Sequence, residues 1–161
     1  NVLGKGWLTH DGLWFYQAYR EFGIEEANRL NKAAVQSLAP IEIERMKRLL
    51  GIKEIETFDD LEQFMSAALE LTLPGSVFNK FHLTSHAGSM MRWKWERSQC
   101  FAYKGMKRIG AIDGYRCGVM YRIECWLEVL GIRYSMHPKI GGCLMHEKGV
   151  CEGEIRFFLN G

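Results

Sequence analysis

The first 99 residues contain no cysteine, whereas five cysteines lie between Cys100 and Cys151. The chain also lacks a marked charge excess, since 21 Lys and Arg face 19 Asp and Glu and leave a formal net charge of +2. That balance gives no argument for a nucleic-acid partner. The basic run from Arg92 to Arg108 is expected to be a solvated face, because Trp93 and Trp95 alternate with its first charges and point the other way.

Long apolar runs and the commonest enzyme signatures are missing too. Charged residues interrupt every apolar run before the roughly 20 residues that a membrane span needs, so we expect no membrane insertion. The sequence has no phosphate-binding loop, dinucleotide fingerprint, Gly-x-Ser-x-Gly elbow or His-Glu-x-x-His motif. The segment Asn1–His10 lacks the basic and apolar regions of a secretion signal, so we expect a cytoplasmic protein. Cysteines in that compartment act as thiols or metal ligands.

What the chain does contain is the composition of one globular domain. Its 161 residues are 47% hydrophobic and 25% charged, enough to bury about 70% of the surface of the unfolded chain. We expect a single domain over 1–161, made of a helical subdomain over 1–73 and a mixed α/β subdomain over 74–161.

Apolar residues recur at spacings of three and four throughout the first subdomain. This period predicts four helices, over 12–22, 24–39, 40–51 and from Leu61 to about Leu69. We expect Asp11 to cap the first helix and Pro40 to separate the second from the third. Thr57 with Asp60 predicts a capping box before the fourth.

The period changes after Pro74. Residues 76–84 and the alternation from Met91 to Trp95 predict a hairpin that turns at Ala87 and Gly88. Two helices are then expected over 98–109 and 115–130, and two strands over 132–145 and 150–159 with a turn near Gly149. The predicted fold is α+β: an N-terminal helical segment followed by a four-stranded antiparallel sheet covered by helices, in the order strand-strand-helix-helix-strand-strand.

Four of the cysteines fall at the ends of predicted elements: Cys100, Cys117, Cys143 and Cys151. A thiolate at a helix N-terminus, as expected for Cys117, is stabilised by the exposed amides there. Zinc takes three or four soft ligands in a tetrahedron, so these cysteines are a candidate structural zinc site, with His146 as an alternative fourth ligand. The competing interpretation makes them small core residues, which is our expectation for Cys125.

A second candidate site is an aromatic-lined pocket for a small hydrophobic or aromatic molecule. Its candidate residues are His82, Trp93, Trp95, Tyr121, Glu124 and Trp126. His82 is expected within an apolar sheet face, either as a core histidine or as a residue that orients a ligand. A buried Glu124 would have a raised pKa and could act as an acid or base, whereas a solvated Glu124 would not. The aromatic residues are equally explained by core packing.

The cysteine spacing C-x16-C-x25-C-x7-C, with Tyr115-Arg116-Cys117-Gly118 and Gly149-Val150-Cys151 around it, resembles the vinyl-4-reductase-type domain. That family includes the phenol-sensing domains of bacterial transcriptional activators. The resemblance implies a structural zinc on Cys117, Cys143 and Cys151 beside a pocket for an aromatic ligand. The sensors add a glutamate three residues before the middle cysteine, where this chain has Ile140, so its fourth ligand differs or is absent.

A second resemblance covers most of the chain and starts at His10-Asp11-Gly12-Leu13-Trp14-Phe15. Over this stretch the chain resembles an uncharacterised family of bacterial and archaeal cytosolic proteins, which is akin to the L-2-amino-thiazoline-4-carboxylate hydrolase-like proteins. This resemblance implies Cys100 as the fourth zinc ligand. It also implies an alternative function, hydrolysis of a small amide or cyclic amidine with Cys117 as the nucleophile, activated by His146 or His137.

The sequence therefore favours a small-molecule-binding or sensing domain with a structural zinc site over an enzyme. A further alternative is a dimeric interaction scaffold. Related α/β domains pair through helices, and the helix that carries Trp14 and Phe15 would supply the surface of a homodimer.

Overall fold

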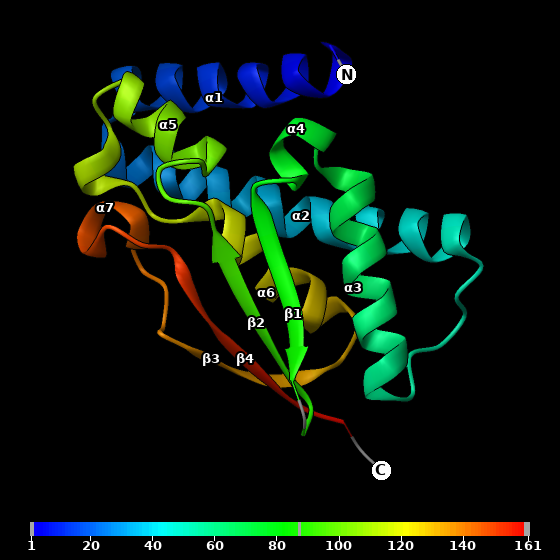
Figure 1. The fold of residues 1–161 in the computed structure, drawn as a ribbon. Coiled ribbons are helices and arrows are strands. Elements are labelled where there is room, and N and C mark those ends of the chain that lie inside the picture. Colours follow the sequence, from blue (N-terminus) through cyan, green and yellow to red (C-terminus); the bar gives the residue numbers. More distant parts are fainter. Residues whose placement is uncertain (1, 87, 160–161) are drawn as a thin grey trace.

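A computed structural model describes residues 2–86 and 88–159, and Figure 1 shows their arrangement. The elements are, in chain order, α1 (Val2–Phe22), α2 (Ile24–Leu50), α3 (Phe58–Thr72), α4 (Gly75–Phe78), β1 (Phe81–His86), β2 (Met90–Trp95), α5 (Phe101–Arg108), the 3-10 turn η1 (Ile112–Gly114), α6 (Gly118–Val129), β3 (Arg133–His137), α7 (Leu144–Lys148) and β4 (Glu152–Phe158). Helices α1 to α4 precede the first strand and helices α5 to α7 lie between later strands, and the predicted α+β architecture is confirmed.

The four strands form one antiparallel sheet in the order β1-β2-β4-β3. β1 and β2 make the predicted hairpin, with Phe81 opposite Trp95, and β4 inserts between β2 and β3. Along β2, Met91, Trp93 and Trp95 are buried while the residues between them are exposed, as the period of two requires. Ala87, expected in the hairpin turn, lies outside the described residues.

Helices cover one face of this sheet. In Figure 1, α2 and α6 lie behind the sheet, and α1 crosses above it. α2 makes its most extensive contacts with α1 and α6. One cluster of buried residues draws on both halves of the chain, from Phe15 and Phe64 to Trp126 and Phe157. The opposite sheet face carries exposed side chains on all four strands. Across 2–86 and 88–159, no helix is long and apolar enough to cross a bilayer.

Two predictions about the N-terminal helices are wrong. α1 already begins at Val2, so Asp11 lies inside the helix instead of capping it. α2 continues through Pro40, although proline removes one intrahelical hydrogen bond. Ala39 and Ile43 beside Pro40 are buried, and helices owe most of their stability to such packing. Three long helices, rather than four, therefore precede α4.

The second half departs from the prediction at its element ends. Residues 76–78, expected in a strand, lie in α4. The strand expected over 132–145 ends at His137, because Pro138 follows and cannot donate to the ladder. Residues Leu144–Lys148 form α7 instead, and Gly149 ends that helix with a φ of 74°, so a helix rather than a turn joins β3 to β4.

The start of α3 has the predicted capping box. The Asp60 amide donates to Thr57 Oγ1 at 3.2 Å, and the Thr57 amide donates to Asp60 Oδ2 at 2.8 Å. The hydrogen bonds to the Asp60 carboxylate, led by that from the Thr57 side chain, lower its pKa.

Candidate ligand pocket and thiol site

Four cysteines come together where three helices and the last strand begin. Cys100, Cys117 and Cys143 are the N-cap residues of α5, α6 and α7, and Cys151 directly precedes β4. Burial raises the pKa of the Cys151 thiol most, and the other three thiols lie near enough that their negative charge would raise it further. Cys117 and Cys143 likewise lie near Cys100. Segments up to 51 residues apart in the chain thus place their thiols in one region.

Burial dominates the chemistry of these thiols. It raises the pKa of Cys100 to about 12 and that of Cys117 to about 11. It also raises the pKa of Cys143 and of Cys151. As a residue Cys117 is partly exposed, yet burial remains the largest influence on its thiol. With no metal bound, these groups are neutral thiols at neutral pH.

Hydrogen-bond donors surround the same sulfurs. Six backbone amides in the first turns of the three helices oppose the effect of burial, those of Ala102, Tyr103, Val119, Met120, Met145 and His146. They lower the pKa without completing a capping hydrogen bond. The buried indole N–H of Trp93 has no full hydrogen-bond partner, but it lies near enough to Cys151 to lower the pKa of that thiol. These donors only partly offset burial, but they would stabilise a thiolate, which is the form that binds metal.

Within the described residues, no three His, Cys, Asp or Glu side chains are arranged to hold a metal ion. The sulfurs therefore approach one another without forming a closed coordination shell. The side chain of His146 is engaged elsewhere, with its Nε2 at 2.8 Å from Asp113 Oδ1. Cys125 is 2% exposed within α6, so the expectation that it is a core residue is confirmed.

A cavity of about 160 Å³ lies between the sheet and the helices. Its buried aromatic walls are Phe15 of α1, Phe81 and Trp95 of the hairpin, Tyr115, and Trp126 of α6. These rings pack against one another in pairs. The ring centroids of Phe15 and Tyr115 are 5.6 Å apart, and those of Phe81 and Trp95 are 5.0 Å apart. An engineered apolar cavity of about 150 Å³ binds benzene, so this space suits one aromatic ring.

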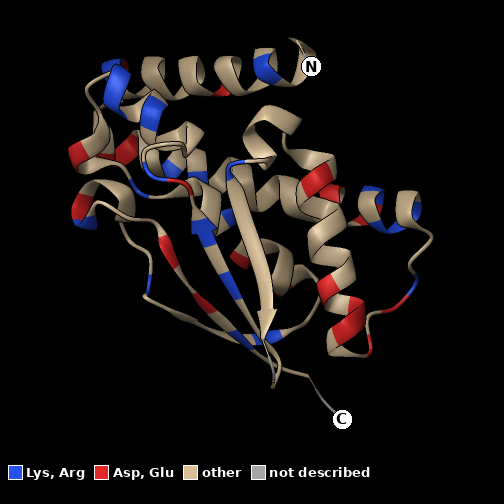
Figure 2. Ribbon diagram, in the orientation of Figure 1, with Lys and Arg blue, Asp and Glu red and all other residues tan. Residues whose placement is uncertain are grey.

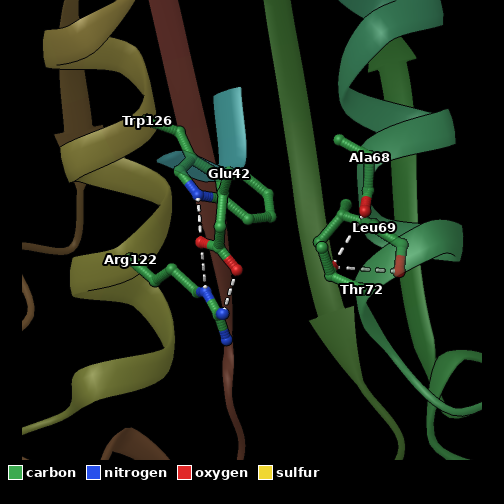
Figure 3. A network of polar contacts seen from close by, with 6 residues as sticks. All are labelled: Glu42, Ala68, Leu69, Thr72, Arg122 and Trp126. Atoms are coloured by element: carbon green, nitrogen blue, oxygen red, sulfur yellow. Dashed lines mark hydrogen bonds and ion pairs between the residues drawn. The ribbon is translucent and has the colours of Figure 1, made fainter. Parts of the chain in front are cut away.

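Most polar groups along the cavity already have partners. Figure 3 shows Glu42 of α2 between two residues of the cavity wall. Its Oε2 accepts from Arg122 Nε and from Trp126 Nε1, both at 2.9 Å, and its Oε1 accepts from Arg122 Nη2. Thr72 donates to a carbonyl of its own helix at 2.8 Å. The indole N–H of Trp95, which is 2% exposed, is buried without a partner among the described residues.

The predicted pocket residues divide between this cavity and other places. Trp95 and Trp126 line it, whereas Trp93 is buried nearer to Cys151. The expected burial of His82 is wrong. Its side chain is 53% exposed with Nε2 3.8 Å from Glu96, because alternate residues of β1 turn outward.

Tyr121 and Glu124 are absent from the lining of the cavity. The Lys32 ammonium lies 4.7 Å from the centre of the Tyr121 ring. Glu124 is half-buried, and burial raises its pKa, an effect that the nearby Tyr134 side chain partly opposes. Both side chains therefore interact locally, apart from the cavity.

Several residues of the cavity wall were not predicted from the sequence. Two of them had a sequence signal. Phe15 lies in the motif from His10 to Phe15, and Tyr115 lies two residues before Cys117. Glu42, which accepts from the wall residues Arg122 and Trp126, had no local signal.

Comparisons with known proteins place most of the chain in one family. A family model described as a family of unknown function (DUF6125) matches residues 2–124. The match includes Cys100 and Cys117 and ends before Cys143 and Cys151. No curated protein and no solved structure matches the chain.

Proposed function

The chain belongs to the family of unknown function DUF6125, and we propose that this domain binds a small, flat, apolar molecule between its sheet and its helical cover. The cavity of about 160 Å³ carries the proposal, because apolar and aromatic side chains dominate its wall. Ligand pockets are typically apolar with a few polar groups that set the orientation of the ligand.

The unused N–H of Trp95 narrows the ligand class. A buried donor without a partner costs about 1–3 kcal/mol, and a hydrogen-bond acceptor on the ligand would remove that cost. Arg122 and Trp126 already donate to Glu42. The ligand that fits best is therefore a single aromatic ring with one acceptor group.

A structural zinc on Cys100, Cys117, Cys143 and Cys151 is the second part of the proposal. Buried thiols near one another, with amides at three helix N-termini, are a donor set that suits zinc. Bound metal would displace the thiol protons and stabilise the fold. Phe101 and Gly118, which line the cavity, directly follow Cys100 and Cys117, so the same site would stabilise the pocket. Five free cysteines suit a cytoplasmic location.

Two probes of similar size test the pocket. Phenol carries an acceptor oxygen and toluene does not, so calorimetry should show saturable binding of both and tighter binding of phenol. Trp95→Phe removes the donor and should weaken phenol about tenfold while toluene changes little. Ala102→Leu, which extends a side chain into the cavity, should weaken both. Absence of saturable binding of either probe to the wild-type protein overturns the pocket proposal.

Metal analysis tests the zinc site. Protein purified under reducing conditions without added zinc should carry one zinc per chain, and Cys→Ser at any of the four positions should lower that content. Cys125→Ala is the matched control, because Cys125 is also a buried cysteine but lies outside the set. Wild-type protein without stoichiometric zinc would rule the site out.

The hydrolase alternative with Cys117 as nucleophile stays a prediction. Burial raises the pKa of Cys117 to about 11, which disfavours a free thiolate nucleophile. Thiol alkylation separates the two functions. One fast-reacting cysteine supports the hydrolase, whereas protection that a chelator releases supports zinc.

A further inference from the structure

The outer face of α1 is apolar. The exposed large hydrophobic residues of this helix are Val2, Leu3, Trp7, Leu13, Trp14 and Phe22. Trp7 is 61% exposed and Trp14 67% exposed, whereas Phe15 is the buried residue of α1. Figure 2 shows few charged positions along α1 at the edge of the molecule. A surface helix normally turns its apolar residues toward the core and its polar residues toward solvent, so large apolar side chains on the exposed side of α1 are unusual.

Three of these residues form one stripe along the helix together with His10. Leu3, Trp7, His10 and Trp14 follow one another at spacings of four, three and four, which is the spacing of a coiled-coil seam. The His10 ring packs edge-on against Trp7, with centroids 5.5 Å apart. At 100° per residue, Phe15 lies about 100° from Trp14 and points into the core. The stripe is therefore a second apolar face, distinct from the one that the chain itself covers.

This stripe is complementary to itself. When two copies of α1 lie antiparallel about an axis between Trp7 and His10, Leu3 of one copy meets Trp14 of the second. Trp7 then meets His10 of the second copy. Each contact occurs twice, as a two-fold interface requires, and each joins an indole to a smaller side chain.

The exposed apolar area of α1 approaches the area that a dimer interface needs. At their exposures of 61% and 67%, the Trp7 and Trp14 indoles contribute about 150 Å² of exposed apolar area each. Their sum already reaches the few hundred Å² of the largest apolar patch on a typical monomer. Leu3 enlarges the stripe, and the exposed side chains of Val2 and Leu13 flank it on one side. Together they extend the apolar surface toward the roughly 800 Å² that each partner buries in a standard interface.

We propose that the stripe joins two copies of this chain as an antiparallel α1 pair. A membrane surface is a poorer occupant, because membrane-bound helices are rich in Lys and Arg and α1 contains only Lys5 and Arg20. Neither Trp7 nor Trp14 lines the cavity, so substitutions at these two residues test the dimer separately from ligand and zinc binding.

Sedimentation from about 1 to 100 μM tests the proposal on the full chain. We expect a dimer for the wild type and, for Trp7→Glu and Trp14→Glu, a dimer dissociation constant weakened about 100-fold. Leu49→Glu is the matched control, because Leu49 is a 72% exposed apolar residue at the end of α2, and it should leave the dimer intact. Circular dichroism melting checks that the variants are folded.

Amide hydrogen exchange supplies a second readout. Protection of residues 2–14 should rise with protein concentration in the wild type and not in Trp14→Glu. A wild-type chain that stays monomeric to 100 μM overturns the proposal, and so does dimerisation of the two tryptophan variants at wild-type affinity. Binding of a monomer to anionic vesicles through Trp7 and Trp14 would assign the stripe to a membrane instead.

Discussion

Replacement of Glu42 by alanine perturbs the polar network that joins α2 to α6. The Glu42 side chain is 11% exposed and pairs with Arg122, and it also accepts from the Trp126 indole at 2.9 Å (Figure 3). Both donors line the cavity. Glu42→Ala leaves a guanidinium and an indole N–H without their acceptor, so it should destabilise the fold and loosen one wall of the cavity.

The size of the effect follows from burial. Removing one partner of a buried ion pair costs about 3–5 kcal/mol. The Arg122 side chain is 30% exposed, so water compensates part of the loss, and we expect a decrease of about 2–3 kcal/mol in the free energy of unfolding. In a protein of this length 1 kcal/mol corresponds to about 2–4 °C, which gives a drop in Tm of roughly 5–10 °C.

Urea and thermal unfolding followed by circular dichroism measure this effect. Glu44→Ala is the control, since Glu44 is an exposed glutamate of the same helix, and it should change stability by no more than about 0.5 kcal/mol. The double variant Glu42→Leu with Arg122→Met should recover much of the loss, because no charge is left buried without a partner. If Glu42→Ala is as stable as Glu44→Ala, the network does not stabilise the fold and the reasoning fails.

Three smaller substitutions test other contacts. Asn28 is 4% exposed, and its side chain hydrogen-bonds two backbone groups of the segment before α6, at 2.8 and 2.9 Å. Urea unfolding of Asn28→Ala should therefore show a decrease of about 2–3 kcal/mol in the free energy of unfolding. An unchanged free energy contradicts this. A Cβ at Gly153 would lie 2.3 Å from the Trp93 ring and 2.5 Å from a backbone oxygen. Gly153→Ala should therefore lower the free energy of unfolding by about 1–3 kcal/mol and lower the Tm, and an unchanged Tm contradicts the clash. The pKa of Asp60 is lowered, chiefly by the Thr57 side chain, so its contribution to stability is complete above the unfolded pKa of about 3.9 and is lost as pH falls through the folded value. Denaturation from pH 6 to 2 should therefore show a weaker acid dependence for Asp60→Asn, and identical curves would refute this.

Local signals predicted most elements of the fold. Thr57 and Asp60 cap α3 because both halves of that motif lie within one turn. The alternation from Met91 to Trp95 placed three apolar side chains on the buried face of β2, since the period of a strand does not depend on its surroundings. Pro40 failed as a stop signal, because its effect depends on what packs against the helix.

The candidate site was predictable only in part. The sequence placed Cys100 and Cys117 at helix starts, because N-terminal positions have a recognisable pattern. Cys143 was expected near the end of a strand and is instead the N-cap residue of α7. The sequence could not show that Cys151 lies near all three, since their distances depend on how α5, α6, α7 and β4 are arranged. The pairing of Glu42 with Arg122 joins residues 80 positions apart and has no local signal.

The sequence alone determined the α+β class, the alternating face of β2, the capping box of α3 and the positions of the cysteines at element ends. These depend on periodicity and on residues within one helical turn of each other. Only the tertiary structure decided that α2 passes through Pro40, that the thiols converge, that Trp95 and Trp126 share a cavity and that α1 keeps a second apolar face. Each of these depends on which segments become neighbours, and that is decided by burial of apolar surface over the whole chain.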